Sequence, residues 1–202
     1  MQPAAQLRID RLKTYILGSY PPAASVPGWG RKVYPAASVE TIMQTEEELG
    51  FPLPELLRAV YAQIGNGWSG FIGLKGGETD EWGSSLEGRY RMVRLPHPDY
   101  PECPWPDGLV PLENWGCNIW SCVHCLKRRN PVVRFDPNGI DYENYPKSFS
   151  ISFSHEAGSL RCWFKAYAER RVSFRPPHLR PRRTMIDGQG RSSVEPPENT
   201  KL

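Results

Sequence analysis

The chain has 202 residues, 39% of them hydrophobic, which is enough to bury the core of one domain and short for two. No stretch approaches the ~20 apolar residues of a membrane span and the start lacks a secretion signal, so we expect a cytoplasmic protein without a membrane partner. The net charge of the chain is +3. Residues 172–202 hold six basic and three acidic residues and account for all of it, so the remaining residues are neutral overall. A neutral domain disfavours nucleic acid as a partner.

Residues 1–37 are expected to join the domain as a helix followed by a loop. Proline and glycine are frequent in residues 21–35, and neither continues a helix well. The apolar stripe of the predicted helix consists of Leu7, Ile9, Leu12 and Ile16.

Two further helices are predicted between residues 38 and 64. Ser38 is suited to cap the first helix, and Gly50 is suited to end it. This helix places Val39, Ile42 and Leu49 on one side. The second helix starts at Pro54 and ends at a Gly-Asn-Gly triplet, and its buried stripe consists of Leu56, Leu57, Val60, Tyr61 and Ile64.

Beyond residue 67 short apolar runs alternate with turn-forming residues, which is typical of a sheet. The predicted strands are residues 71–74, 109–112, 117–125, 132–135 and 149–153. In the last of them, strict alternation places Phe149, Ile151 and Phe153 on a buried face. Residues 86–93 fit either a helix or an irregular segment.

A closing helix is predicted after the last strand, with Ser154 or Ser159 as its N-cap. Its apolar residues at i, i+3, i+4 and i+7 are Leu160, Trp163, Phe164 and Tyr167. The prolines, serines and charges of residues 172–202 predict a disordered tail.

Residues 114–139 admit two interpretations, which differ in what the cysteines do. As ligand spacing, Cys117, Cys122 and Cys125 beside His124 suit zinc or an iron–sulfur cluster, because these centres take thiolate and imidazole ligands. As a hairpin, the first strand turns Cys122 away from the other two thiols, which lie roughly 26 Å apart at ~3.3 Å per residue. Zinc needs its sulfurs at about 2.3 Å, so the geometry favours the hairpin and predicts no metal and no cofactor.

The sequence singles out no catalytic centre, so we expect a protein that is not an enzyme. Gly65, Gly67 and Gly70 follow a predicted helix and not a strand, which argues against a phosphate-binding loop. No pair of acids has the apolar setting that tunes a catalytic carboxyl group.

Acidic residues are concentrated between residues 40 and 102, where eleven acids face five bases. A face of this charge can steer a basic protein partner. Trp68, Trp82 and Trp105 lie in predicted loops, where tryptophan either anchors a partner or covers a sheet edge. The candidate partner contacts, chosen from charge, are Glu78, Asp80, Glu81 and Trp82.

Three segments, spanning about residues 39–170 in the same order, resemble the SUKH superfamily of Smi/Knr-type domains in its bacterial immunity branch. The first segment has an acid-leucine-glycine triplet, then a leucine-proline pair at the start of a helix, and then a glycine-rich loop after that helix. The second segment is the cysteine-containing hairpin. The third segment is the closing helix. The residues that carry the resemblance are Leu49, Gly50, Leu53, Pro54, Asn66, Gly67, Trp115, Gly116, Cys117, Trp120, Cys122, Cys125, Arg134, Phe135, Asp136 and Trp163.

Helices, then strands, then a helix predict a single α+β domain over residues 38–171, with helices on a mainly antiparallel sheet. The resemblance implies the same fold and an immunity protein that occludes a cognate nuclease or deaminase toxin. Two alternatives stay open: a regulatory scaffold like the yeast cell-wall-assembly regulators, and a metal-binding domain that uses Cys117, Cys122 and Cys125.

Overall fold

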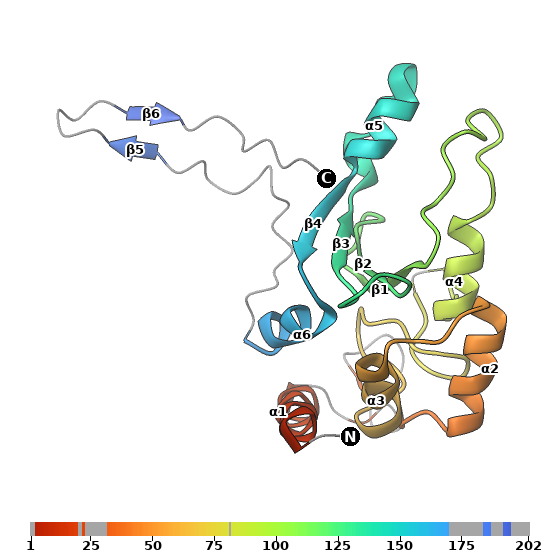
Figure 1. Ribbon diagram of the computed structural model, residues 1–202, viewed down its shortest axis with the longest axis vertical. Helices are drawn as coiled ribbons and strands as arrows, with labels where there is room; N and C mark the ends of the chain where they lie inside the picture. The colour runs from red at the N-terminus through yellow and green to blue at the C-terminus, as the bar shows by residue number, and fades with distance from the viewer. Residues whose placement is uncertain are drawn as a thin grey trace. The chain divides into compact units, whose positions relative to one another are not determined.

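The computed structural model describes residues 3–19, 22, 32–80, 82–169, 184–186 and 192–194 (Figure 1). The chain divides into two compact units, Met1–Val172 and Ser173–Leu202. In the second unit, β5 (Thr184–Ile186) pairs antiparallel with β6 (Ser192–Val194), where the composition predicts a disordered tail. The other residues of the predicted tail lie outside the described part of the chain, so the prediction of disorder is not tested there.

The first unit contains a four-stranded sheet in which consecutive strands are neighbours and every pair is antiparallel. Its strands are β1 (Leu109–Asn114), β2 (Trp120–His124), β3 (Val132–Phe135) and β4 (Phe153–Ala157). The register places Glu113 opposite Ser121, and Ser121 opposite Arg134. A row of polar residues therefore crosses three strands of the sheet.

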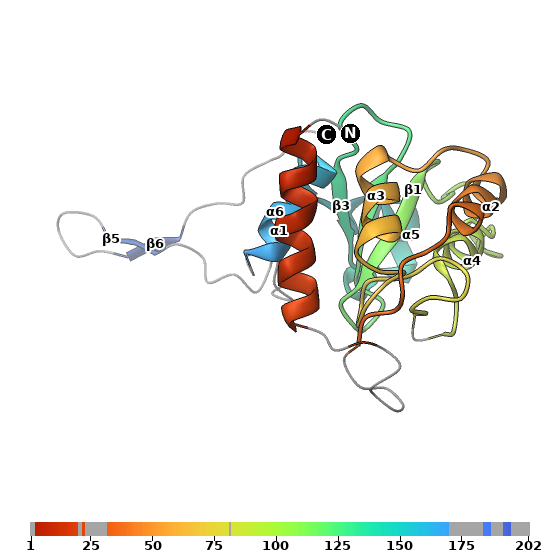
Figure 2. The same cartoon turned by 90° about the horizontal axis from the view of Figure 1, so that it is seen from below.

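Helices precede, interrupt and follow the strands. They are α1 (Pro3–Ser19), α2 (Val39–Leu49), α3 (Glu55–Gln63), α4 (Leu86–Val93), η2 (Pro137–Gly139), η3 (Tyr142–Asn144), α5 (Tyr145–Ile151) and α6 (Leu160–Ala168). Figure 2 shows α1 along α6 and α2 beside α4. The fold is α+β, as predicted, and residues 86–93 are a helix. Within the described residues, no helix is both long and apolar enough to span a membrane.

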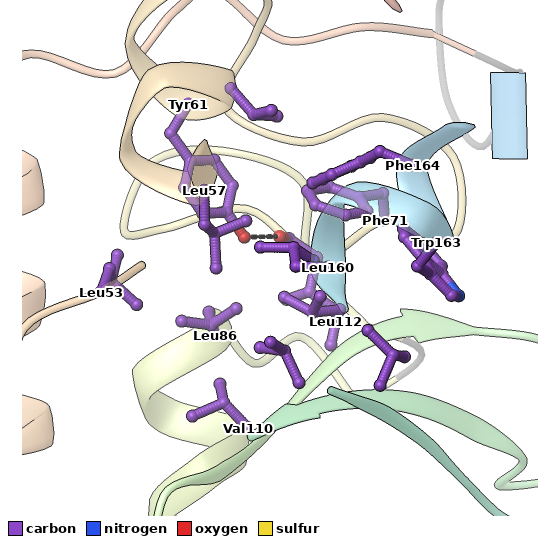
Figure 3. Packing of buried hydrophobic residues seen from close by; sticks show 14 of the residues in the cluster. Leu53, Leu57, Tyr61, Phe71, Leu86, Val110, Leu112, Leu160, Trp163 and Phe164 are labelled. Carbon is purple, nitrogen blue, oxygen red and sulfur yellow. Dashed lines mark hydrogen bonds between the residues drawn. The ribbon is translucent and has the colours of Figure 1, made fainter. Parts of the chain in front are cut away.

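The core lies where α3, α4 and α6 meet β1 (Figure 3). The Tyr61 hydroxyl donates to the Ile72 carbonyl oxygen at 2.7 Å, so its ring is buried without losing a hydrogen bond. The core side chains labelled in Figure 3 are Leu53, Leu57, Tyr61, Phe71, Leu86, Val110, Leu112, Leu160, Trp163 and Phe164. The predicted stripe of α6 is confirmed, and that of α3 is confirmed for Leu57, Val60, Tyr61 and Ile64, whereas Leu56 is partly buried.

The predicted stripe of α1 is confirmed for Ile9, Leu12 and Ile16, which are buried, whereas the side chain of Leu7 lies outside the described part. In α2, Ser38 Oγ accepts the Thr41 N–H at 3.1 Å, and Gly50 ends the helix at φ 80°.

The prediction that Val39 shares one side of α2 with Ile42 and Leu49 is wrong, because Val39 is exposed while the other two are buried. The buried face of α2 consists of Ile42, Thr45 and Leu49. At 3.6 residues per turn, Val39 points roughly 90° away from the centre of that face.

The predicted strand at residues 149–153 is also wrong. Residues up to Ile151 belong to α5, and β4 starts at Phe153. Pro146 suits a first helical turn, and Ser148 Oγ donates to the Asn144 carbonyl oxygen at 3.0 Å. These local contacts favour the helix.

Residues 71–74 run beside β1 without forming a strand of the sheet. Two hydrogen bonds join the segments, from Ile72 N to Leu112 O and from Asn114 N to Gly70 O, both 2.8 Å. Beyond them the chain curls, because Leu74 N donates to Asn66 Oδ1 at 2.7 Å. The predicted strand is therefore a loop held by an asparagine side chain.

The β2–β3 hairpin is confirmed, but its first strand starts later than predicted. Cys117 and Asn118 have positive φ angles of 52° and 59°, and Ile119 N donates to Gly116 O at 3.0 Å. Cys117 therefore lies in a turn and not on the strand.

Candidate functional site

Asp80 organises the loop in which it lies. Its Oδ1 accepts the backbone N–H groups of Trp82 at 2.9 Å and Ser84 at 2.8 Å, and its other oxygen pairs with Arg89. The guanidinium of Arg89 lies 5.0 Å from the ring centroid of Trp120. The interpretation of Asp80 as an exposed charge is wrong, because its carboxylate is buried and bonded.

The rest of the predicted acidic surface is small. Glu78 is half-buried, and burial raises the pKa of its carboxyl group, although nearby Lys32 acts in the opposite direction. Glu81 lies outside the described residues. Among the described members of the predicted contact set, Trp82 offers the most exposed side chain.

Trp82 projects from a turn that is fixed on both sides. Asp80 N donates to Ser84 O at 3.0 Å, and Ser84 Oγ contacts Met92 Sδ at 3.4 Å. The side chain of Trp82 is 65% exposed, and Met92 and Leu95 of the adjacent helix end are exposed as well. We call Trp82, Met92 and Leu95 the α4 flank. Of the other loop tryptophans, Trp68 and Trp105 are buried in the core.

Asn66 and Gly67, from the first resemblance segment, shape the loop under Glu78. Asn66 bonds to Leu74 through both its amide oxygen and its amide nitrogen. A Cβ at Gly67, where φ is 89°, would lie 2.7 Å from Glu78 Cβ, so a larger residue would displace this loop.

The second segment forms a bonded network across the sheet. Trp115 Nε1 donates to Ser121 Oγ at 2.8 Å, and Ser121 Oγ donates to Glu156 Oε2 at 2.5 Å. Arg134 Nη2 donates to Glu156 Oε1 at 2.8 Å, and its guanidinium lies 5.5 Å from the Trp115 ring centroid. These residues hold β2, β3 and β4 together.

The other residues of the resemblance also have structural positions. Leu49 and Gly50 end α2, Leu53 is buried, Pro54 is the N-cap of α3, Gly116 is in the turn before β2, Phe135 is on β3, Asp136 caps η2, and Trp163 is in the core.

Glu113 lies beside this network and is buried. Burial, and then the nearby Glu156 carboxylate, hold the pKa of Glu113 well above its ordinary value, against a hydrogen bond with Tyr167. Two carboxyl groups in unequal environments can serve as acid and base. Neither residue lines the cleft described below, so we assign this pair no catalytic role.

The three hairpin cysteines differ in their environments. Cys117 is exposed, Cys122 is buried, and Cys125 is partly buried. Burial raises the pKa of Cys125 to about 12 and that of Cys122 well above its ordinary value, which disfavours the thiolate that metals and nucleophilic chemistry need. In the part of the chain that the structure describes, no three His, Cys, Asp or Glu side chains are grouped to hold a metal ion.

A cleft of about 420 Å³ lies between α2, α4 and the turn that connects β2 to β3. Its walls combine apolar and charged side chains. The lining residues are Glu48, Leu49, Phe51, Glu87, Tyr90, Arg91, Arg94, Asp107, Gly108 and Leu126.

The sequence interpretation missed this cleft, because its walls come from four segments that are far apart in the chain. One signal was available: Leu126 is followed directly by Lys127, Arg128 and Arg129 in a predicted connection between strands. Single exposed apolar residues are common at protein surfaces, so this pattern alone did not identify the cleft.

Comparison of the chain with protein families, curated proteins and solved structures finds no match.

Proposed function

We propose that this chain is a non-catalytic protein-binding domain of the SUKH type that acts as an immunity protein. It neutralises a cognate toxin, of the nuclease or deaminase kind, by covering the toxin's active surface. The proposal rests on the sequence resemblance and on one structural observation, which is the presentation of Trp82.

Trp82 has the properties of a binding anchor. Tryptophan is enriched at interface hot spots, because it buries a large area while losing little side-chain entropy. The Asp80–Arg89 ion pair and two backbone hydrogen bonds fix the turn that carries Trp82, so binding costs little additional ordering. Met92, whose Sδ contacts Ser84 Oγ of the same turn, and Leu95 at the end of α4 are exposed apolar residues as well.

Co-expression with the product of a neighbouring toxin gene tests the proposal. Wild-type protein should restore growth of a host that the toxin kills. Trp82→Ala should protect less at limiting expression and should raise the dissociation rate about tenfold or more, as loss of a desolvated anchor does.

Ile151→Ala is the matched control, because Ile151 is an apolar residue of α5 with 70% exposure, close to the 65% of Trp82. It should protect as well as wild type. Full protection by Trp82→Ala would remove the α4 flank from the mechanism. If wild type protects against no neighbouring toxin, the regulatory scaffold becomes the better description.

A further inference from the structure

The cleft combines apolar walls with a charged rim, and two ion pairs neutralise charges of that rim. Phe51 and Tyr90 meet edge to face with ring centroids 5.5 Å apart. At the rim, Arg91 pairs with Glu48 at 2.8 Å, while a second pair joins Arg94 to Asp107. These pairs leave the apolar walls as the part of the cleft that is available to a ligand.

One wall of the cleft is also unusually exposed. Leu126 is 56% exposed and lies directly over Gly108, where an added Cβ would be 2.5 Å from Leu126 Cγ. Because much of the apolar surface of Leu126 is in contact with water, covering it with an apolar group of a ligand is favourable.

Three cations follow Leu126 on the same turn. Lys127, Arg128 and Arg129 are exposed, and none of the ion pairs in the described part of the chain includes them. The turn is well defined, because Asn130 Nδ2 donates to Cys125 O at 3.0 Å and Lys127 O at 3.3 Å. The cations therefore extend from a fixed backbone at the edge of the cleft.

We propose that the cleft and this basic turn bind an acidic segment of the protein partner. An apolar side chain of the segment enters between Leu49, Phe51 and Leu126. Carboxylates on either side of it pair with Lys127, Arg128 and Arg129 outside. This inference rests on the proposed function and names the chemistry of the partner.

The charges of the lining decide between an acidic peptide and other occupants. Glu87 is the most buried charged group of the cleft, and its Oε2 has no hydrogen-bond partner, so a second carboxylate is unfavourable inside. The acidic groups of the occupant therefore stay on the turn, and nucleic acid fits less well than a peptide with one apolar anchor.

The cleft alone is smaller than a stable protein interface, which buries about 800 Å² on each side. Helix α4 connects it to the α4 flank, since Arg91 and Arg94 line the cleft and Met92 and Leu95 belong to the flank. One partner can cover both surfaces.

Peptide binding to the full chain tests the inference without a toxin. The probe is a short fluorescent peptide in which one leucine is flanked by glutamates, and binding is followed by fluorescence anisotropy. Lys127→Glu/Arg128→Glu and Leu126→Ser should each weaken binding about tenfold, and added salt should weaken it in wild type. Lys147→Glu/Arg161→Glu reverses two exposed charges on α5 and α6 and should leave binding unchanged.

Thermal midpoints equal to that of wild type establish that the variants are folded. The inference is overturned if the peptide does not bind or if the variants bind as well as wild type. Tighter binding of a lysine-flanked peptide or a single-stranded DNA oligonucleotide also overturns it. The growth assay with Trp82→Ala is independent of these results, so the proposed function and the acidic occupant can fail separately.

Discussion

Asp80 shows how burial changes the role of a charged residue. Its side chain is 0% exposed and that of its partner Arg89 is 9% exposed. Charge pattern alone suggested a surface contact, since the sequence gives the sign of a charge but not its depth. A buried ion pair is sensitive to loss of one member, because the other charge stays in a poorly solvating environment.

We expect Asp80→Asn to lower the free energy of unfolding by about 3–5 kcal/mol, the range for a buried charge left without its partner. Urea denaturation measures the loss. Asp107→Asn is the matched control: Asp107 pairs with Arg94 with its side chain 76% exposed, and its loss should cost less than about 1 kcal/mol. Equal effects of the two substitutions would contradict the structural role of Asp80.

At the scale of elements, sequence periodicity was sufficient to predict a helix wherever the spacing of apolar residues fitted only a helix. The stripes of α3 and α6 and the caps of α2 give helical patterns with clear ends, and these three helices form, although Val39 lies off the buried face of α2. Phe149 and Phe153 are ambiguous, because residues four apart share a face in a helix as well as in a strand. Ile151 distinguishes the two: a strand would place it on the same face as Phe149 and Phe153, whereas a helix turns it away from Phe149. Its exposure therefore agrees with the helix.

Helix α6 provides the most direct test of how an element contributes to the core. Trp163 is fully buried. Its ring centroid lies 5.1 Å from that of Tyr167 and 5.2 Å from that of Phe164. Trp163→Ala should lower the free energy of unfolding by about 3–5 kcal/mol, since it leaves a large cavity. Denaturation of this variant beside Cys162→Ala, which removes an exposed neighbour, checks the prediction. Unchanged stability of Trp163→Ala would place the stripe on the wrong side of α6.

At the scale of the whole molecule, the fold class could be predicted but the cleft could not. The order of helical and apolar segments is a property of the sequence, and it determined the α+β class. The cleft brings Phe51, Tyr90, Gly108 and Leu126 together through tertiary packing, which no local pattern encodes. Trp82 was found from its predicted loop position beside acidic residues, while the turn that presents it depends on the contact between Asp80 and Arg89.

Glu113 connects the chemistry of one residue to the stability of the whole domain. It lies on β1, opposite Ser121 of β2, and its carboxyl group interacts with Glu156 of β4 and Tyr167 of α6. Burial and the Glu156 carboxylate raise the pKa of Glu113 from its ordinary 4.5. Above that value the unfolded chain has lost the proton that the folded protein retains. The stability contributed by this site therefore falls as the pH rises from about 4.5 towards the raised pKa.

Replacing Glu113 with glutamine removes this titration while keeping a group that can hydrogen-bond to Tyr167. We expect Glu113→Gln and wild type to be similar in stability near pH 4.5, and the variant to gain on wild type as the pH rises from there towards the raised pKa of Glu113. Urea denaturation at several pH values measures the difference, and Glu143→Gln, at an exposed position in η3, should follow the wild-type profile. Parallel profiles for wild type and Glu113→Gln would mean that the carboxyl group of Glu113 is not held protonated by the fold.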